Sequence, residues 1–172
     1  MHSGAKIGVI VSYKDGGAEG ADQFFRSVAM HIAAMSPSVL TTDELDAEFV
    51  AKETEALRGQ IKVENEDRAR LGKPLKTIPE FGGRCQLTAD VMAKVEDTIK
   101  EELKAEGKPE KIWDKIIPGK IERFIADNTQ VDQEHCLLSQ FFALDDSKTV
   151  EAAVKDFCDA AEILAFKRVA TG

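Results

Sequence analysis

Three short segments rich in β-branched and other apolar residues lie far apart in this chain, and their spacing limits the possible folds more than any other feature. They occupy residues 6–13, 136–144 and 163–170. The stretches between them are too long for hairpin turns, so the three segments cannot form one continuous meander, and helices must connect them. We therefore expect an α+β fold with a small antiparallel sheet of about three strands packed against helices.

The first strand and its neighbours have clear local signals. The segment KIGVIVSY at residues 6–13 is apolar nearly throughout, which predicts a mostly buried strand. After a glycine-rich turn, apolar residues recur on one helical face, which predicts a helix over about residues 20–35 that ends before Pro37. Near the other end of the chain, Thr149 can cap a helix that precedes the last strand.

The middle of the chain predicts an inserted helical hairpin. A helix that the sequence at residues 41–43 can cap begins apolar and becomes densely charged over residues 64–70. After a loop, Thr88 can cap a second helix with an apolar stripe that needs a partner, and the charged helix is the nearest one. This stripe is made by Met92, Val95, Ile99 and Leu103. We expect residues 48–107 to form the hairpin and residues 1–47 and 108–172 to form a discontinuous core domain.

Two helices alone cannot bury such a stripe completely, so the predicted hairpin requires a further surface. It can pack against a second copy of the chain, which would make it a dimerisation module. It can equally fold back on its own domain. The sequence leaves both alternatives open.

Composition excludes several classes of protein. The 172 residues are 43% hydrophobic and carry a net charge of -8, without a large basic block, so we expect neither nucleic acid nor a membrane as a partner. No apolar run approaches the roughly 18 residues of a membrane span, and the first residues lack the pattern of a signal peptide. The 3 cysteines have unrelated spacings, which favours a reducing cytoplasm over a disulfide framework.

No segment carries a convincing enzyme signature. The loop at residues 15–20 lies between a predicted strand and helix, but it lacks the Lys-Ser/Thr pair of a phosphate-binding loop, and a plain turn is favoured. The histidines and cysteines lack the spacing of metal ligands, and we interpret His31 as a hydrogen-bonded histidine at the edge of a core. Cys158 falls near the buried face of a predicted helix, where thiols are usually inert. We expect no cofactor and no metal.

Four motifs occur in a characteristic order along the chain. They are HSGAKIGVIV from residue 2, AMHIAAMSP at 29–37, GKPEKIWDKIIPGKIERF at 107–124 and QFFALDDSKTV at 140–150. Together they resemble the elongation factor Ts family, the nucleotide-exchange factors of the GTPase elongation factor Tu. The resemblance covers roughly residues 1–52 and 105–170. It implies the C-terminal core subdomain of the family with its inserted dimerisation hairpin, without the family's N-terminal half.

The resemblance implies a protein-binding role without bond chemistry, in which the chain docks on elongation factor Tu and lacks the family's wedge residues. The family histidine before the first strand falls on His2, and the apolar pair after the Q-x-F strand falls on Ala143 and Leu144. All three are expected contacts of elongation factor Tu, although Leu144 could instead belong to the core at a strand end. Two other classes stay open, a nucleotide binder or small enzyme that uses residues 15–20, and a purely structural dimerisation module.

Overall fold

A computed structural model describes residues 6–171, which fall into two compact units. One unit comprises Met1–Glu44 together with Gln133–Gly172, and the other comprises Leu45–Asp132. The sequence-based division into residues 48–107 and a flanking core differs from this one, which assigns residues 45–47 and 108–132 to the second unit.

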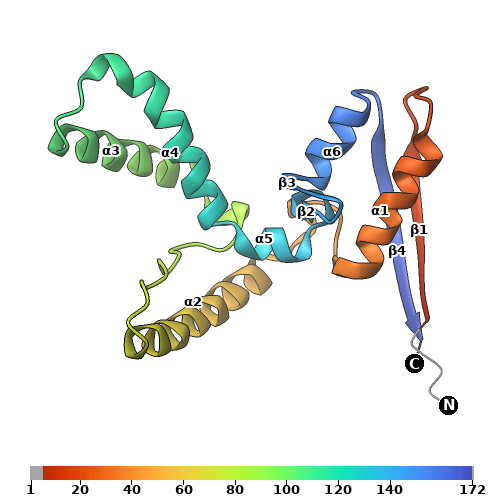
Figure 1. Cartoon of the computed structure of the whole chain (residues 1–172), viewed down its shortest axis with the longest axis horizontal. Helices are drawn as coiled ribbons and strands as arrows, with labels where there is room; N and C mark the ends of the chain where they lie inside the picture. The colour runs from red at the N-terminus through yellow and green to blue at the C-terminus, as the bar shows by residue number, and fades with distance from the viewer. Residues whose placement is uncertain (1–5, 172) are drawn as a thin grey trace. The chain divides into compact units, whose positions relative to one another are not determined.

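The first unit is built on a two-stranded antiparallel sheet. Strand β1 (Lys6–Lys14) pairs along its length with β4 (Glu162–Thr171), and helix α1 (Ala21–Met35) packs against β1 (Figure 1). The expectation of a mostly buried first strand is wrong, because β1 alternates between half-buried and exposed side chains, and Ile10 is 69% exposed. Successive side chains of a strand point to opposite faces, so packing against one face of a sheet buries only every second residue.

The core of this unit lies where α1 and α6 (Val150–Phe157) meet the strands. The Phe25 ring stacks on Tyr13 with ring centroids 3.9 Å apart, and Phe24 stacks on Phe157 with ring centroids 4.4 Å apart. Thr149 caps α6 as predicted, since its Oγ1 accepts a hydrogen bond from the Ala152 N–H at 3.2 Å. The buried apolar side chains are Ala21, Phe25, Val28, Ile32, Leu137, Phe142, Val150, Ala153, Val154, Ala161 and Ile163.

The predicted strand over residues 136–144 is largely wrong. Cys136 makes an isolated bridge with Val39, and Leu137–Ser139 form a 3-10 turn. Only Phe141–Phe142 form a strand, β2, which pairs with β3 (Asp145–Thr149). Within residues 6–171 the strands therefore form two separate pairs and not one three-stranded sheet. A short apolar run does not distinguish a strand from a buried turn, because periodicity is absent in both.

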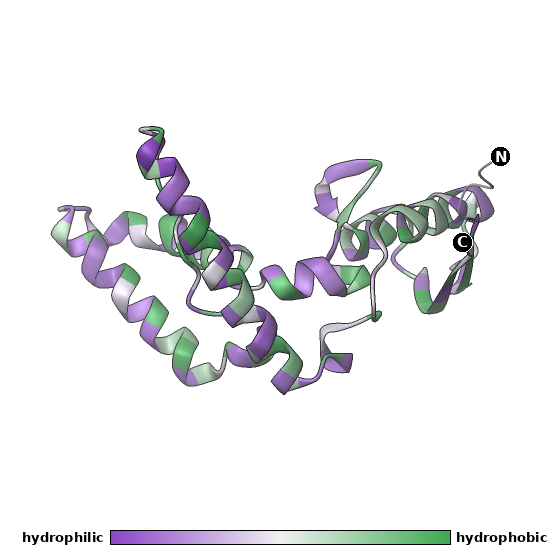
Figure 2. Cartoon of the chain, turned by 90° about the horizontal axis from the view of Figure 1, so that it is seen from below, coloured by the Kyte–Doolittle hydropathy of each residue, from purple (hydrophilic) through white to green (hydrophobic). Residues whose placement is uncertain are grey.

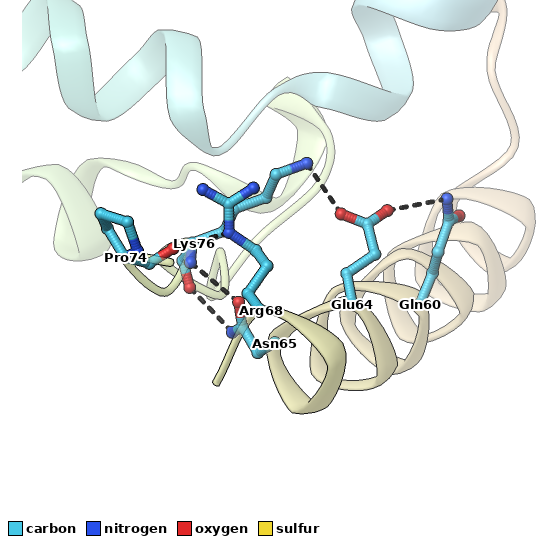
Figure 3. Close-up of polar contacts among 6 residues, drawn as sticks. All are labelled: Gln60, Glu64, Asn65, Arg68, Pro74 and Lys76. Atoms are coloured by element: carbon cyan, nitrogen blue, oxygen red, sulfur yellow. Dashed lines mark hydrogen bonds and ion pairs between the residues drawn. The ribbon is translucent and has the colours of Figure 1, made fainter. Parts of the chain in front are cut away.

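In the second unit, α2 (Ala47–Arg70) binds the chain that follows it. Its N-cap is Asp46, whose Oδ2 accepts from the Phe49 N–H at 3.3 Å, and not the predicted residues 41–43. Residues 73–83, which we call the return segment, run back beside α2 and are held by side chains of the helix (Figure 3). The polar end of α2 thus binds main-chain groups of the return segment.

The contacts between α2 and the return segment form a series. The Asn65 side chain donates to the Lys76 carbonyl oxygen at 2.9 Å and accepts from the Lys76 N–H at 2.8 Å, while Arg68 Nε donates to the Pro74 carbonyl oxygen at 2.6 Å. The Lys76 ammonium also pairs with Glu64 at 2.7 Å (Figure 3). At the base of α2, a side chain on Gly82 would collide with Thr54, so glycine allows the main chain to lie directly on the helix.

The other two long helices of this unit pack against each other. They are α3 (Ala89–Ala105), which Thr88 caps as predicted, and α4 (Trp113–Asp127), which continues through Pro118. The expected pairing of the α3 stripe with the charged helix α2 is wrong, because the main partner of α3 is α4. Figure 2 shows hydrophilic and hydrophobic residues interleaved along the helices. The polar side chains of α2 hold the return segment, and α3 packs against α4 instead.

Candidate partner-binding site at the β2–β3 turn

Ala143 and Leu144 form the two-residue turn that connects β2 and β3. Phe142 pairs with Asp145, which leaves only these two residues to reverse the chain. Both side chains are exposed, and Leu144 is 63% exposed, so it is not part of the core. The third residue expected to contact a partner, His2, lies outside the residues that the structure describes.

The two strands give this turn little support of their own. Their ladder consists of the pairs Phe141–Thr149 and Phe142–Asp145, with an irregular register between them. Asp145 Oδ1 stabilises the irregular part by accepting hydrogen bonds from the N–H and the hydroxyl of Ser147, at 3.2 and 2.5 Å. An isolated two-stranded hairpin is marginally stable in water even with a regular ladder. The position of the turn must therefore be fixed from outside the hairpin.

A buried pair of polar side chains supplies that support. The Ala143 N–H donates to His31 Nδ1 at 3.0 Å, and His31 Nε2 lies 2.9 Å from Gln140 Oε1. Because a backbone N–H can only donate, Nδ1 is the unprotonated acceptor nitrogen, and the ring proton is assigned to Nε2, which donates to Gln140. The Gln140 amide group completes the series by donating to the Glu134 carbonyl oxygen at 2.7 Å.

The surroundings of this pair favour the neutral imidazole. His31 and Gln140 are each 1% exposed, and the Phe142 ring lies against the imidazole with ring centroids 5.9 Å apart. Burial lowers the pKa of His31, and the hydrogen bond to Gln140 opposes this shift. The sequence correctly predicted a hydrogen-bonded histidine, but it placed the residue at the edge of the core, whereas the ring is fully buried.

Sequence reasoning did not single out Gln140, the hydrogen-bond partner of His31. The available signal was a single amide side chain inside the mostly apolar run CLLSQFF at residues 136–142. A buried amide must find hydrogen-bond partners, so such a residue indicates a polar contact with a distant element. The sequence could not identify His31 as that partner, since 109 positions separate the two residues.

The glycine-rich loop at residues 15–20 has the geometry of a plain turn. The Gly17 N–H donates to the Asp15 carboxylate at 2.9 Å, so a loop donor that a phosphate would need is already engaged by an acidic side chain. Across residues 6–171, no group of three or more histidine, cysteine, aspartate or glutamate side chains is placed to hold a metal ion. None of the helices there combines the length and the apolar character needed to cross a membrane.

The apolar stripe of α3 is unevenly covered. Ile99 and Leu103 are buried, whereas Met92 and Val95 are half-buried. Val95 also lines a groove of about 700 Å³ whose walls come from α3, α4 and the return segment. The apolar lining residues of this groove are Phe81, Val91, Val95, Ile99 and Phe124.

Comparison with known proteins assigns the chain to a family. The family model described as "Elongation factor TS" matches residues 1–172. The chain is 67% identical to elongation factor Ts of Rhodopirellula baltica over 171 residues, which is 98% of this chain and 52% of that protein. It is 52% identical to elongation factor Ts of Campylobacter concisus over 159 residues, covering 91% of this chain and 45% of that protein. The corresponding protein of Helicobacter pylori strain Shi470 is 50% identical over 158 residues, covering 90% of this chain and 44% of the relative.

The chain spans about half the length of the curated relatives that it matches. The match nevertheless extends over the whole of the sequence, and the motifs around His31 and Gln140 lie within it. This chain therefore belongs to the elongation factor Ts family.

Proposed function

We propose that this chain binds elongation factor Tu in the cytoplasm and takes part in the release of GDP from that GTPase. Membership of the elongation factor Ts family supports the choice of partner. The role is one of binding and does not require bond chemistry. A protein that binds the nucleotide-free GTPase more tightly than the GDP-bound form must lower the affinity for GDP by the same factor.

The contact surface that we propose is the turn of Ala143 and Leu144. The observation that carries this proposal is the exposure of Leu144, 63% of whose surface is in solvent, on a turn whose base is buried. A fixed apolar side chain binds with a smaller loss of conformational entropy than one on a mobile loop. The small side chain of Ala143 leaves room for a partner to approach the main chain closely.

Self-association through α3 is a second proposal, and the groove beside Val95 favours it. Of the four residues of the α3 stripe, Met92 and Val95 are the more accessible, because Ile99 and Leu103 are buried within the chain. A substitution of Leu103 is therefore expected to weaken the fold of the second unit before it affects any dimer. A dimer lost on substitution of Val95 by Asp, with unchanged unfolding, would support the proposal, and an unchanged dimer would contradict it.

Calorimetric titration of the chain into elongation factor Tu tests the main proposal. We expect saturable binding to the nucleotide-free GTPase and weaker binding to the GDP-bound form, since differential affinity is what drives exchange. A full-length relative titrated under the same conditions is the positive control. Binding by the relative alone, with no heat or competition from this chain, would contradict the proposal.

A further inference from the structure

We propose that His31 is the positioning residue of the β2–β3 turn, and that its unprotonated Nδ1 holds the main chain of Ala143 so that Leu144 is presented to the partner. The importance of this contact for binding rests on the function proposed above. The placement of the turn by His31 does not depend on that function, and it can be measured on the free chain.

The turn itself requires an external acceptor. Two-residue hairpin turns that match the twist of their strands need positive φ angles, and glycine or asparagine usually supplies them. Ala143 and Leu144 are neither, and among the described non-glycine residues Ser36 alone has a positive φ. The turn thus lacks the backbone conformation that would stabilise it from within. The Ala143 N–H is instead satisfied by a side chain from α1, which lies 112 positions away in the sequence.

Gln140 fixes the orientation of the imidazole. Its side-chain oxygen lies 2.9 Å from His31 Nε2, and its side-chain nitrogen donates to the Glu134 carbonyl oxygen at 2.7 Å. Its main-chain oxygen accepts from the Val150 N–H at 2.9 Å, at the start of α6. Both ends of the amide group are therefore engaged, and the amide cannot rotate without losing a buried hydrogen bond. The oxygen consequently faces His31, which keeps the proton on Nε2 and leaves Nδ1 free to accept.

Two substitutions of His31 separate positioning from simple packing. An asparagine side chain places its oxygen near the position of histidine Nδ1, so His31→Asn keeps an acceptor for the Ala143 N–H. A glutamine side chain places its amide near the position of Nε2, so His31→Gln keeps the contact with Gln140 and loses the acceptor for Ala143. Asparagine is the smaller of the two and leaves the larger cavity. If His31 acted only by filling space, His31→Asn would be the more damaging change.

The experiment combines nuclear magnetic resonance of the free chain with binding to nucleotide-free elongation factor Tu. We expect wild-type spectra to show a neutral imidazole protonated at Nε2. The Ala143 amide signal should stay near its wild-type position in His31→Asn and move in His31→Gln. The affinity for elongation factor Tu should stay within about threefold of wild type in His31→Asn. It should fall by roughly tenfold in His31→Gln, because that is the effect of losing one buried hydrogen bond.

Each outcome decides a different claim. A proton on Nδ1, or an Ala143 amide signal that is unchanged in His31→Gln, would overturn the placement of the turn by His31. A larger loss of binding in His31→Asn than in His31→Gln would show that packing dominates and would overturn the proposal. A wild-type chain that shows the expected spectra and does not bind would overturn the proposed function and the binding role of His31, while its role in placing the turn would stand.

Discussion

The main-chain N–H of Ala143 donates to Nδ1 of His31 at 3.0 Å, inside a core in which the histidine is 1% exposed. Through this bond, helix α1 near the start of the chain holds the β2–β3 turn near its end. The same turn carries Leu144, the exposed side chain that we propose as a contact with a partner protein. The proposed binding function depends on this bond, because the buried His31 side chain holds the turn that exposes Leu144.

The stability of the first unit should depend on pH through His31. Its pKa in the folded chain lies below the ordinary value of 6.5, because burial penalises the imidazolium ion. Below pH 6.5 the unfolded chain therefore binds a proton that the folded chain does not, and the free energy of unfolding falls as the pH decreases towards the folded pKa. Above pH 6.5 this contribution is constant.

Urea unfolding followed by the fluorescence of the only tyrosine, Tyr13, measures this effect in the first unit. His31→Asn is the control, since asparagine does not titrate. Charged groups on neighbouring elements, such as Glu134, Asp145, Lys148 and Arg168, are unchanged in the control and cancel in the comparison. Equal slopes of unfolding free energy against pH in both proteins would contradict the prediction.

Leu103→Ala should destabilise the second unit by about 2–5 kcal/mol, the usual cost of a leucine truncated in a core. Leu103 is 0% exposed on α3, a helix whose main partner is α4. The only tryptophan, Trp113, begins α4 and reports the unfolding of this unit by its fluorescence. Leu75→Ala is the matched control, because Leu75 is 61% exposed and its truncation should cost less than about 0.5 kcal/mol. Similar losses of unfolding free energy in Leu103→Ala and Leu75→Ala would show that Leu103 lies outside the core.

Asn65→Ala should release the return segment from α2. The substitution removes two hydrogen bonds to the main chain of Lys76, each of which contributes about 1 kcal/mol to stability. Hydrogen exchange at the Lys76 amide should therefore accelerate by roughly ten- to thirtyfold. Gln60→Ala is the control on the same helix, because its amide makes only a long contact with Glu64 at 3.4 Å. Equal exchange rates in the two variants would show that Asn65 does not hold the segment.

Local signals predicted the helices of this chain, and two of the three caps that they indicated, better than the contacts between elements. Thr88 and Thr149 cap the helices that they precede, as a threonine before an apolar periodic segment indicates. The partner of α3 was predicted wrongly, because the sequence shows that Leu103 needs an apolar neighbour without showing which helix provides it. Chain proximity favoured α2, whose polar side chains turn out to bind the return segment.

The candidate site was predictable only in part. A resemblance of sequence motifs was enough to single out Ala143 and Leu144, but not to show that the surrounding strand is two residues long. The contact between His31 and Gln140 joins residues that are 109 positions apart, and periodicity carries no information on pairs at that separation. Only the folded chain brings the two motifs together.

The most direct test of the proposed contact is the affinity of Leu144→Asp for nucleotide-free elongation factor Tu, measured by calorimetry beside Leu75→Asp. The two leucines are 63% and 61% exposed, so neither substitution should disturb the fold. A charge at the centre of a protein interface is costly, and we predict a loss of about tenfold or more for Leu144→Asp and an unchanged affinity for Leu75→Asp. Equal affinities of Leu144→Asp and the wild-type chain would contradict the assignment of this turn as the contact surface.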